Sequence, residues 1–514
     1  MTLAPETVAR LIDTATVGRA AATVPVVSPF TGEWVFDLPH GTEADVESAV
    51  ANLRRGQRVW ARVPLRERSR ILLRFHDLML EHRDECLDIA QLETGKSRRD
   101  AMEELLDVVI VTRHYARDAA RLLRPRRHRG VFPGAVGVVQ YQVPKGVVGN
   151  LAPWNYPITM AASDAVPALL AGNSVLMKPD VLSTLTALWV VDLMHRAGVP
   201  RDVITVVPGD GPVIGPMVIE HVDYVMFTGS TRVGREVAAR CGERLIGCSL
   251  ELGGKNAMII RADADIERAA EIAIRGSFSN AGQLCISMER IYVHAAAYDA
   301  FVRAFTRRVG ALQFATGVGW RGEIGSLISE RQLARVQGHV DDAVAHGARV
   351  LAGGRARPDI GPYYFEPTVL EGVTEDMIAC DEETFGPVVA LYPVQSDEEA
   401  IRLANDTAYG LNGAVITRDR AAGRTMARRL RAGTVNVNEA YGSAWGSTRA
   451  PMGGMGDSGL GRRHGDEGLL KYTDSQTVAT QRALGIGAQF GWTDEKWMNT
   501  VASVFKAAKV IGLK

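Results

Sequence analysis

The sequence predicts an α/β protein built from two α/β halves. A chain of 514 residues is too long for one ordinary hydrophobic core, so two or three domains are expected. From about residue 146, short β-branched runs such as "SVLMKP" and "VITVVPG" alternate with helical segments, which is typical of βαβ units in a parallel sheet. A second strand–helix series begins near residue 256 and continues to "GTVNVNEA". Two such halves predict a ligand cleft between them.

The segment before the first half is helical. Between about residues 42 and 122, apolar residues recur at steps of three and four, as in "EADVESAVANLRRGQRVW", and predict antiparallel helices that cap a neighbouring domain. Residues 124–145 differ, because prolines surround an alternating "VGVVQYQV". This pattern predicts an extended arm or hairpin, and the basic run 124–129 is typical of a solvated surface.

The balanced charge argues against binding to nucleic acid or to an anionic membrane. The chain ends predict a protein of the cytoplasm. Lys plus Arg (59) equals Asp plus Glu (59), so no global field would gather nucleic acid or an anionic membrane. The N-terminus lacks a signal-peptide pattern, and no apolar run reaches the length of about 18 residues that spans a membrane. The C-terminal "WMNTVASVFKAAKVIGLK" is amphipathic. We expect a solvated helix that packs on its own domain, because stable membrane attachment generally needs a second signal.

The five cysteines are odd in number, scattered and without CxxC or metal-type spacing: Cys86, Cys241, Cys248, Cys285 and Cys380. They predict free thiols in a reducing compartment and no metal site. Cys285 stands out in "SNAGQLCISMERIYV", because its small and amide neighbours leave room for a substrate carbonyl and offer N–H dipoles that favour a thiolate. Cys241, Cys248 and Cys380 have no such context and are interpreted as packing residues.

Three further segments fit Cys285. "PWNYP" places Asn155 at the end of one predicted strand, and "LELGGKN" places Glu251 at the end of another, 34 positions before Cys285. A thiol that adds to an aldehyde, an amide that holds the oxyanion and a carboxylate that activates water make a specific set. "FTGSTRVG" forms a strand-to-helix turn suited to a pyrophosphate, although it lacks the third glycine of a full dinucleotide fingerprint.

Seven motifs in this order resemble the aldehyde dehydrogenase superfamily, closest to its bacterial succinate-semialdehyde dehydrogenase type: "PWNYP", "LMKPD", "FTGSTRVG", "ELGGKN", "GQLC", "EETFGPV" and "PMGGMGDSGLGRRHG". The resemblance implies homodimers or homotetramers and an aldehyde dehydrogenase-like fold. Its expected parts are a Rossmann-like NAD(P)-binding domain (1–123 and 146–253), an α/β catalytic domain (254–450), a small β oligomerisation arm (124–145 and 472–485) and a C-terminal tail (486–514).

The resemblance also implies a role for each site residue. Cys285 is then the nucleophile, Glu251 the general base for deacylation, and Asn155 with the Cys285 backbone N–H the oxyanion hole. The implied cofactor-binding residues are Trp154 in the cleft, Lys178 at the adenosine ribose, Gly229 and Ser230 at the pyrophosphate, Glu383 at the nicotinamide ribose, and Phe385 beside it.

One departure from the family pattern concerns the cofactor. Three residues after Lys178, the family often carries a Glu that binds the adenosine ribose and repels a 2′-phosphate. This sequence has Val181 there, which favours NADP over NAD, while the neighbouring Asp180 restores part of the repulsion.

A second departure concerns the substrate. Typical succinate-semialdehyde dehydrogenases hold the distal carboxylate with two arginines, and this sequence has Ser163 and Ser279 at those places. An unpaired buried carboxylate costs several kcal/mol, so either another cation such as Arg449 replaces the arginines or the substrate is different. The predicted reaction is NAD(P)+-dependent oxidation of an aldehyde to a carboxylic acid, with succinate semialdehyde first and medium-chain or aromatic aldehydes second.

Three other functions were weighed from the sequence. CoA-acylating oxidation is disfavoured by Glu251, a base that enzymes of that kind usually lack. A thiol acyltransferase needs a His beside Cys285, and the motifs around Cys285 contain none. A non-catalytic protein of the same fold would not need Cys285, Glu251, Asn155 and Glu383 together.

Overall fold

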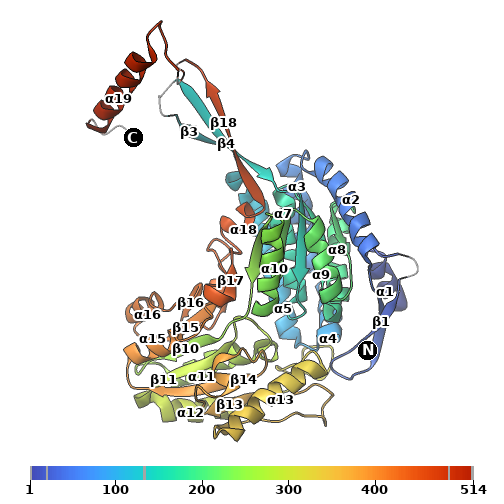
Figure 1. Cartoon of the computed structure of the whole chain (residues 1–514). Coiled ribbons are helices and arrows are strands. Elements are labelled where there is room, and N and C mark those ends of the chain that lie inside the picture. The colour runs from blue at the N-terminus through green and yellow to red at the C-terminus, as the bar shows by residue number, and fades with distance from the viewer. Residues whose placement is uncertain (1–2, 19–20, 131–134, 484, 486, 511–514) are drawn as a thin grey trace.

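The computed structural model describes residues 3–18, 21–130, 135–483, 485 and 487–510. It contains two α/β halves, each built on its own sheet, and a narrow three-stranded arm that extends away from both (Figure 1). The predicted α/β class with two halves is therefore confirmed. Parts of the predicted arm (131–134 and 484) and of the predicted tail (486 and 511–514) lie outside the described residues.

The first sheet has six strands in the order β17-β9-β8-β5-β6-β7, parallel except for β17. The strands are β5 (Val147–Ala152), β6 (Ser174–Pro179), β7 (Ile204–Val206), β8 (Tyr224–Thr228), β9 (Gly247–Glu251) and β17 (Gly459–Leu460). All six residues of β5 are buried, as expected for a central strand covered on both faces. The sheet therefore holds its strand ends, and the site residues that follow them, in fixed positions.

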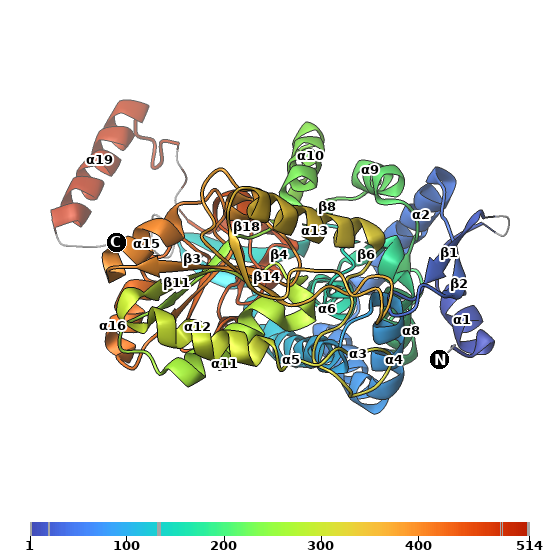
Figure 2. The same ribbon diagram turned by 90° about the horizontal axis from the view of Figure 1, so that it is seen from below.

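Helices cover both faces of this sheet, as Figure 2 shows from below. One face carries α2 (Glu43–Trp60), α9 (Gly211–His221) and α10 (Thr231–Glu243), and the other carries α6 (Pro157–Ala162), α7 (Ala165–Leu170) and α8 (Thr184–Ala197). Outside α8 lie α1 (Pro5–Ile12), α3 (Leu65–Glu81), α4 (Arg83–Thr94) and α5 (Arg98–Leu122), next to a hairpin of β1 (Thr23–Val27) and β2 (Trp34–Pro39). The alternation of strand side chains explains the two cores, since Val147 packs in one and Val148 in the other.

The second sheet has seven strands in the order β12-β13-β14-β11-β10-β15-β16, parallel except for β12. The strands are β10 (Asn256–Ile260), β11 (Met288–His294), β12 (Arg349–Ala352), β13 (Thr368–Glu371), β14 (Val388–Val394), β15 (Asn412–Ile416) and β16 (Thr434–Val437). Its helices are α11 (Ile266–Phe278), α12 (Ala295–Val309), α13 (Glu330–Ala345), α14 (Ile378–Asp381), α15 (Asp397–Asn405), α16 (Arg420–Ala427) and α17 (Gly442–Trp445). Ile291 and Tyr292 point into the cores on opposite faces.

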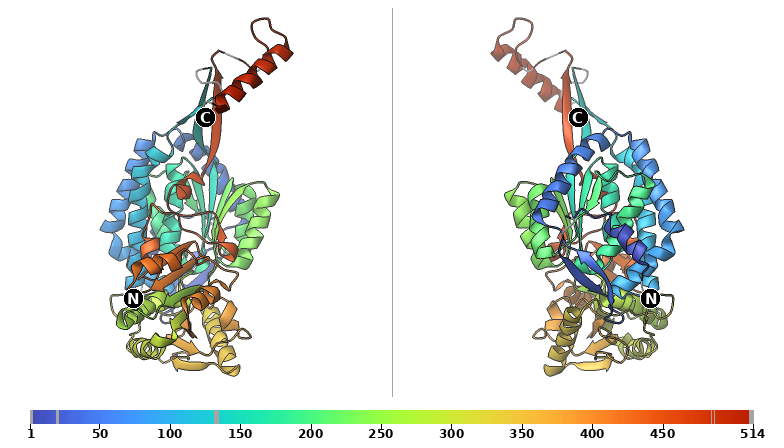
Figure 3. Two further views of the ribbon diagram at one scale, coloured as in Figure 1. Left: turned by 90° about the vertical axis from the view of Figure 1, so that its left-hand side faces the viewer. Right: turned by 90° about the vertical axis from the view of Figure 1, so that its right-hand side faces the viewer.

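The arm consists of β3 (Arg126–Arg129), β4 (Val136–Pro144) and β18 (Thr473–Gln481), paired antiparallel in the order β18-β4-β3. The short helix α18 (Glu467–Leu470) leads into β18. Figure 3 shows the arm standing clear of the two halves, with helix α19 (Asp494–Val510) beside the outer part of the arm. The expectation that the C-terminal helix packs on its own domain is wrong. Only Trp497 of α19 is buried, and its ring contacts lie within the tail, against Phe490 and Trp492.

Candidate active site

Cys285 follows a tight loop that backbone geometry fixes in place. Asn280, Ala281 and Gly282 all have positive φ angles of 52°, 53° and 70°. A Cβ atom at Gly282 would lie 2.0 Å from the carbonyl oxygen of Gly386, so only glycine lets the two loops approach this closely. The backbone carbonyl of Cys285 accepts a 2.8 Å hydrogen bond from Nδ2 of Asn256. Cys285 is thus fixed at the border of the core of the second half, where it stays half-buried.

The thiol lies where two cavities meet. One is a wide cleft lined by Trp154, Gly229, Glu383 and Phe385, and the other is a narrow tunnel lined by Glu251, Tyr441 and Arg463 among others. Asn155, Thr228 and Cys285 line both cavities. Cys285 is therefore part of the wall of two cavities at once.

Glu251 ends β9 and faces the tunnel. Its side chain is 4% exposed, and Oε1 has no hydrogen-bond partner among the described residues. Burial raises the pKa of this carboxyl to about 7, against the lowering influence of Arg463 and Lys471. A carboxyl group with a free oxygen and a pKa near neutrality can take a proton from a water or a thiol.

The expectation that the surroundings of Cys285 favour a thiolate is wrong for the free protein. Burial and the nearby carboxylates of Glu383 and Glu251 raise the pKa of the thiol to about 12, and Arg463 only partly opposes them. The resting group is a neutral thiol. Its proton must therefore leave as the thiol reacts, and Glu251 is the carboxyl group in the tunnel that stands free to receive it.

Asn155 is anchored from three directions. Its backbone carbonyl accepts hydrogen bonds from Lys96 Nζ (2.8 Å) and Asn280 Nδ2 (3.0 Å). Its own Nδ2 donates one hydrogen to the carbonyl of Gln283 at 3.1 Å. An amide nitrogen carries two hydrogens, so a second donor remains for an oxygen on Cys285.

A buried ion pair that we did not predict from the sequence supports Asn155. Lys96 and Glu104 pair with both side chains fully buried, and Glu104 Oε2 also accepts hydrogen bonds from the backbone N–H groups of Ile158 (2.9 Å) and Thr159 (3.3 Å). The pair fixes the segment that follows Asn155 into α6. Lys96 lies between α4 and α5, outside any motif, so spacing alone gave no signal of its role.

The wide cleft continues past Gly229 and Ser230 to Lys178. Ser230 caps α10 by accepting a hydrogen bond from the N–H of Val233, which leaves other N–H groups of the first turn facing the cleft. Lys178 is the second-last residue of β6 and is buried, which lowers the pKa of its ammonium group. Trp154 and Phe385 meet edge to face at 5.5 Å on the side of the cleft near Cys285.

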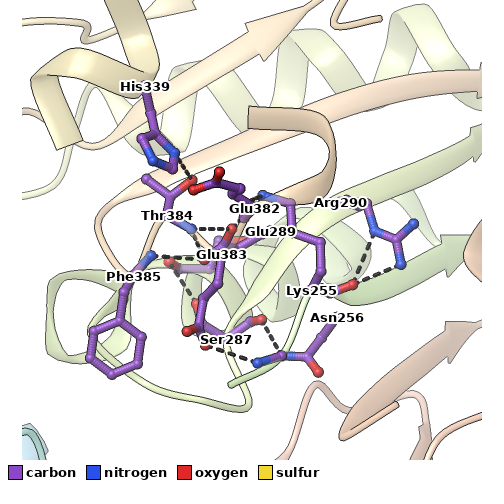
Figure 4. A network of polar contacts seen from close by, with 12 residues as sticks. Lys255, Asn256, Ser287, Glu289, Arg290, His339, Glu382, Glu383, Thr384 and Phe385 are labelled. Atoms are coloured by element: carbon purple, nitrogen blue, oxygen red, sulfur yellow. Dashed lines mark hydrogen bonds and ion pairs between the residues drawn. The ribbon is translucent and has the colours of Figure 1, made fainter. Parts of the chain in front are cut away.

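Figure 4 shows how Glu383 and Phe385 are held. Glu289 of β11 accepts hydrogen bonds from the backbone N–H groups of Thr384 and Phe385 and pairs with Lys255 at 2.6 Å. Glu383 Oε1 accepts a 2.9 Å hydrogen bond from the N–H of Gly254, and burial raises the pKa of Glu383 to about 8. Glu289 was missed from the sequence, although a charged residue inside the buried strand "MERIYVH" was its available signal.

The tunnel has hydroxyl and carboxyl groups where the family pattern placed two arginines. Ser163 donates a 2.9 Å hydrogen bond to Asp107, and the Ser279 hydroxyl lies 2.8 Å from that of Tyr441, which in turn lies 3.1 Å from Glu103. Burial raises the pKa of Asp107 to about 7 and raises that of Glu103.

Arg449 is not the replacement cation that we considered from the sequence. Its side chain is 79% exposed, and it reaches Asp118 at 3.8 Å rather than the tunnel. The cation that does line the tunnel is Arg463, which pairs with Asp164 at 2.6 Å and donates to Thr228 at 2.8 Å. Its Nε has no partner among the described residues.

His464 also lines the tunnel, although no histidine lies near Cys285 in the sequence. Burial, followed by the charge of Arg463, lowers its pKa to about 4, so the ring is neutral at neutral pH. The Nδ1 atom of this ring has no hydrogen-bond partner among the described residues, so His464 is not seen bonded to the Cys285 thiol.

All nine site residues expected from the sequence line this continuous cleft and tunnel. In the part of the chain that the structure describes, no group of three or more His, Cys, Asp or Glu side chains is arranged to hold a metal ion. No described helix combines the length and apolar character needed to cross a bilayer.

Comparison with known proteins places this arrangement in a family. The sequence pattern of the Aldehyde dehydrogenase family matches residues 17–478. A Mycolicibacterium smegmatis protein with the provisional name succinate-semialdehyde dehydrogenase (NADP(+)) is 51% identical over 485 residues, 94% of each chain. The 3,6-anhydro-alpha-L-galactose dehydrogenase of Streptomyces coelicolor is 37% identical over 90% of this chain and 94% of its own. A crystal structure of Staphylococcus aureus betaine aldehyde dehydrogenase with NAD+ is 30% identical, with a TM-score of 0.88 over 95% of this chain and 99% of that one. The family match, the shared fold and the cavities that meet at Cys285 agree: this chain belongs to the aldehyde dehydrogenase family.

Proposed function

We propose that this enzyme oxidises a small aldehyde to the carboxylic acid with NADP+ or NAD+, through a thioester on Cys285. The observation that supports this proposal most strongly is the position of Cys285. It lies at the junction of the cleft and the tunnel, and Glu251 and Asn155 line the same cavities. The cleft would hold the cofactor and the tunnel the aldehyde, so the two would meet at the thiol.

The residues along the cleft fit a dinucleotide. N–H groups of the first turn of α10, after Ser230, suit a pyrophosphate, and the ammonium of Lys178 suits ribose hydroxyls. Glu383 would accept hydrogen bonds from the second ribose, while Trp154 and Phe385 would flank the ring. When bound, NAD(P)+ supplies the acceptor for the hydride that leaves the substrate carbon.

The first half-reaction makes a bond between the Cys285 sulfur and the aldehyde carbon. The thiol proton passes toward Glu251, and the carbonyl oxygen becomes an oxyanion held by Nδ2 of Asn155 and the backbone N–H of Cys285. Arg463 adds a fixed positive charge that favours the thiolate, as its effect on the pKa of Cys285 indicates. Loss of hydride then leaves a thioester on Cys285, and the proton on Glu251 passes to solvent, which restores its carboxylate for the next step.

The second half-reaction hydrolyses that thioester. Glu251 in its carboxylate form takes a proton from a water, and the water oxygen attacks the thioester carbon. The C–S bond breaks, the carboxylic acid leaves and the proton returns to the Cys285 sulfur. The free Oε1 of Glu251 is the atom available for this step.

We propose NADP as the preferred cofactor. Val181 is partly buried against the apolar core and offers no carboxylate to a ribose. Asp180 accepts a hydrogen bond from the N–H of Leu182, which occupies one of its oxygens. Arg232 and Arg240 also line this end of the cleft and would favour a 2′-phosphate.

Succinate semialdehyde is the leading substrate in this proposal, in agreement with the name of the Mycolicibacterium smegmatis relative. Its carboxylate would be received by the hydroxyl of Tyr441, which lies 2.8 Å from the Ser279 hydroxyl, rather than by arginines. The carboxyls of Glu103 and Asp107 in the same tunnel support an uncharged medium-chain or aromatic aldehyde as the second candidate.

Initial rates of absorbance at 340 nm test the reaction and both substrates. Succinate semialdehyde, hexanal and benzaldehyde would each be assayed with NADP and with NAD. We expect a higher kcat/KM for succinate semialdehyde, with NADP preferred. Preference for hexanal or benzaldehyde would replace the substrate, and no rate with any of the three would contradict the reaction itself.

We further propose a homodimer or homotetramer that works in the cytoplasm, assembled through the arm of β3, β4 and β18. An exposed strand edge such as that of β18 is a ready surface for a second chain. Light scattering after size exclusion tests the assembly, since a chain of 55.6 kDa would elute with twice or four times that mass.

A further inference from the structure

Two cysteines lie in the first half of the molecule, where α10 packs on β9. Figure 1 shows α10 beside the first sheet. Cys241 lies in the last turn of α10 and is buried, and Cys248 is the second residue of β9 and is half-buried. Cys248 packs against the apolar cluster that contains Cys241, and each thiol is the strongest influence on the pKa of the other. Both were interpreted from the sequence as separate packing residues, which does not account for this contact.

Backbone hydrogen bonds close the turn between the two residues. The N–H of Ile246 donates to the carbonyl of Cys241 at 3.0 Å, and the N–H of Leu245 donates to that of Gly242 at 3.1 Å. Leu245 has a φ of 55°, as expected for the left-handed residue that closes a helix. Arg244 ties the turn to the end of α9 by donating to the carbonyl of Val222 at 2.8 Å. The chain thus reverses within a few residues and returns along its own helix.

Strand geometry aims the second thiol at the first. Side chains two apart on a strand share a face, so Cys248 and Leu250 point the same way. Leu250 packs in one core cluster with Cys241 and Val237 of α10, and Cys248 packs against that cluster. The contact between the thiols therefore follows from the packing of α10 on β9.

The two thiols differ in the way a nucleophile and its resolving partner differ. Cys248 is the more accessible of the two, and the interaction between the thiols lowers the pKa of Cys248 and raises that of Cys241. Cys380 is also half-buried, but burial and Asp381 raise its pKa. A partly exposed thiol with a lowered pKa, next to a second thiol, is the setting in which reversible oxidation occurs.

We infer that Cys248 and Cys241 form a redox site, distinct from Cys285, that a peroxide converts to an intramolecular disulfide. The Cys248 sulfur attacks one peroxide oxygen, the O–O bond breaks, and a sulfenic acid and one water form when the peroxide is hydrogen peroxide. The Cys241 sulfur then attacks the Cys248 sulfur, and a second water leaves with the thiol proton. Two electrons pass from the two thiols to one peroxide, and a dithiol reductant reverses the change.

The site lies between parts of the active centre. α10 begins at Ser230 in the cofactor cleft, and β9 ends at Glu251 in the tunnel. A disulfide would link the opposite ends of these two elements, seven residues apart in the chain. Cys285 reacts more slowly with a peroxide, because it is held as the thiol rather than the thiolate.

Peptide mapping of the full chain tests the inference, which does not depend on the proposed function. The protein is treated with hydrogen peroxide, alkylated, unfolded and digested with trypsin. Cleavage after Arg240, Arg244 and Lys255 puts the two thiols on separate peptides, residues 241–244 and 245–255. We expect these peptides to appear joined, to separate after reduction, and to be joined before Cys285 or Cys380 is oxidised.

Two variants sharpen the test. Cys241→Ala should give no joined peptide and should leave Cys248 as a sulfenic acid that dimedone traps. Cys380→Ala, which removes a half-buried thiol without another thiol partner, should give the joined peptide as the wild type does. Wild-type protein in which Cys248 oxidises without joining Cys241, or in which Cys285 or Cys380 oxidises first, would overturn the inference.

Discussion

The ammonium group of Lys96 donates a 2.8 Å hydrogen bond to the backbone carbonyl of Asn155. Lys96 also pairs with Glu104, whose second oxygen holds the N–H groups at the start of α6. One buried ion pair therefore fixes both sides of the residue proposed to hold the oxyanion. The orientation of the Asn155 amide therefore depends on Lys96, which lies 59 positions away in the sequence.

Lys96→Met should destabilise the fold and slow the reaction together. Removing one partner leaves the Glu104 carboxylate buried without its counter-charge, which typically costs about 3–5 kcal/mol. Urea denaturation gives the change in stability, and Lys96→Met/Glu104→Leu should regain part of it. Arg449→Met, a cation at 79% side-chain exposure, is the control and should leave the midpoint unchanged. Equal midpoints for Lys96→Met and the wild type would contradict the role of the pair.

The rate of thioester hydrolysis should rise with pH through about 7. Glu251 must be ionised to accept a proton from water, and burial places its pKa near that value. Arg463 is the largest influence that lowers this pKa, so Arg463→Met should move the midpoint upward by roughly one pH unit. The pH profile of kcat measures the shift where hydrolysis limits the rate.

Arg462→Met provides the neighbouring control for that profile. Arg462 also lowers the pKa of Glu251, but it is the weaker influence of the two. We expect a smaller upward shift than for Arg463→Met. A profile that is flat between pH 6 and 8, or one that falls as the pH rises, would rule out Glu251 as the base.

Glu103→Gln should improve the use of succinate semialdehyde. Glu103 lines the tunnel beside Tyr441, and a carboxylate there opposes the distal carboxylate of the substrate. Removing a like charge at close range is worth about 1.4 kcal/mol, or roughly tenfold in kcat/KM. Hexanal has no distal charge, so its kcat/KM should stay the same. Equal changes for both substrates would mean that Glu103 does not sense the substrate tail.

The sequence was sufficient for the fold class and for the residues that follow strand ends. Asn155, Glu251 and the Gly229 turn come after β-branched runs whose ends meet at one edge of the sheet, so their convergence followed from topology. The packing of the C-terminal helix was predicted wrongly, because an amphipathic pattern does not say which surface covers its apolar side. The arm carries α19 beyond the body of the same chain.

The sequence could not predict the pKa values of the site residues or the contacts between residues that lie far apart in the chain. The pKa of Cys285 depends on Glu383, which lies 98 residues later, and on the depth of burial, and neither follows from the "GQLC" motif. Arg463 lies in the "GRRHG" segment that resembles the family motif. Its position in the tunnel depends on a hydrogen bond to Thr228, 235 residues earlier in the chain, which the motif does not predict. Arg449 in the same region is exposed. Which arginine reaches the site depends on side-chain direction, not on distance along the chain.

The roles of Cys285 and Glu251 can be separated in one rapid-mixing experiment. Glu251→Gln is mixed with saturating NADP and succinate semialdehyde, or with the aldehyde that proves best, and NADPH is followed at 340 nm. Cys285→Ala serves as the control and should lose more than about a thousandfold in rate while still binding the cofactor. For Glu251→Gln we predict a burst of up to one NADPH per subunit followed by a stall. The burst should be slower than the first turnover of the wild type, because Glu251 also receives the thiol proton, and the stall follows because the thioester is not hydrolysed. Sustained turnover at the wild-type rate by Glu251→Gln would contradict the central claim that Glu251 releases a thioester from Cys285.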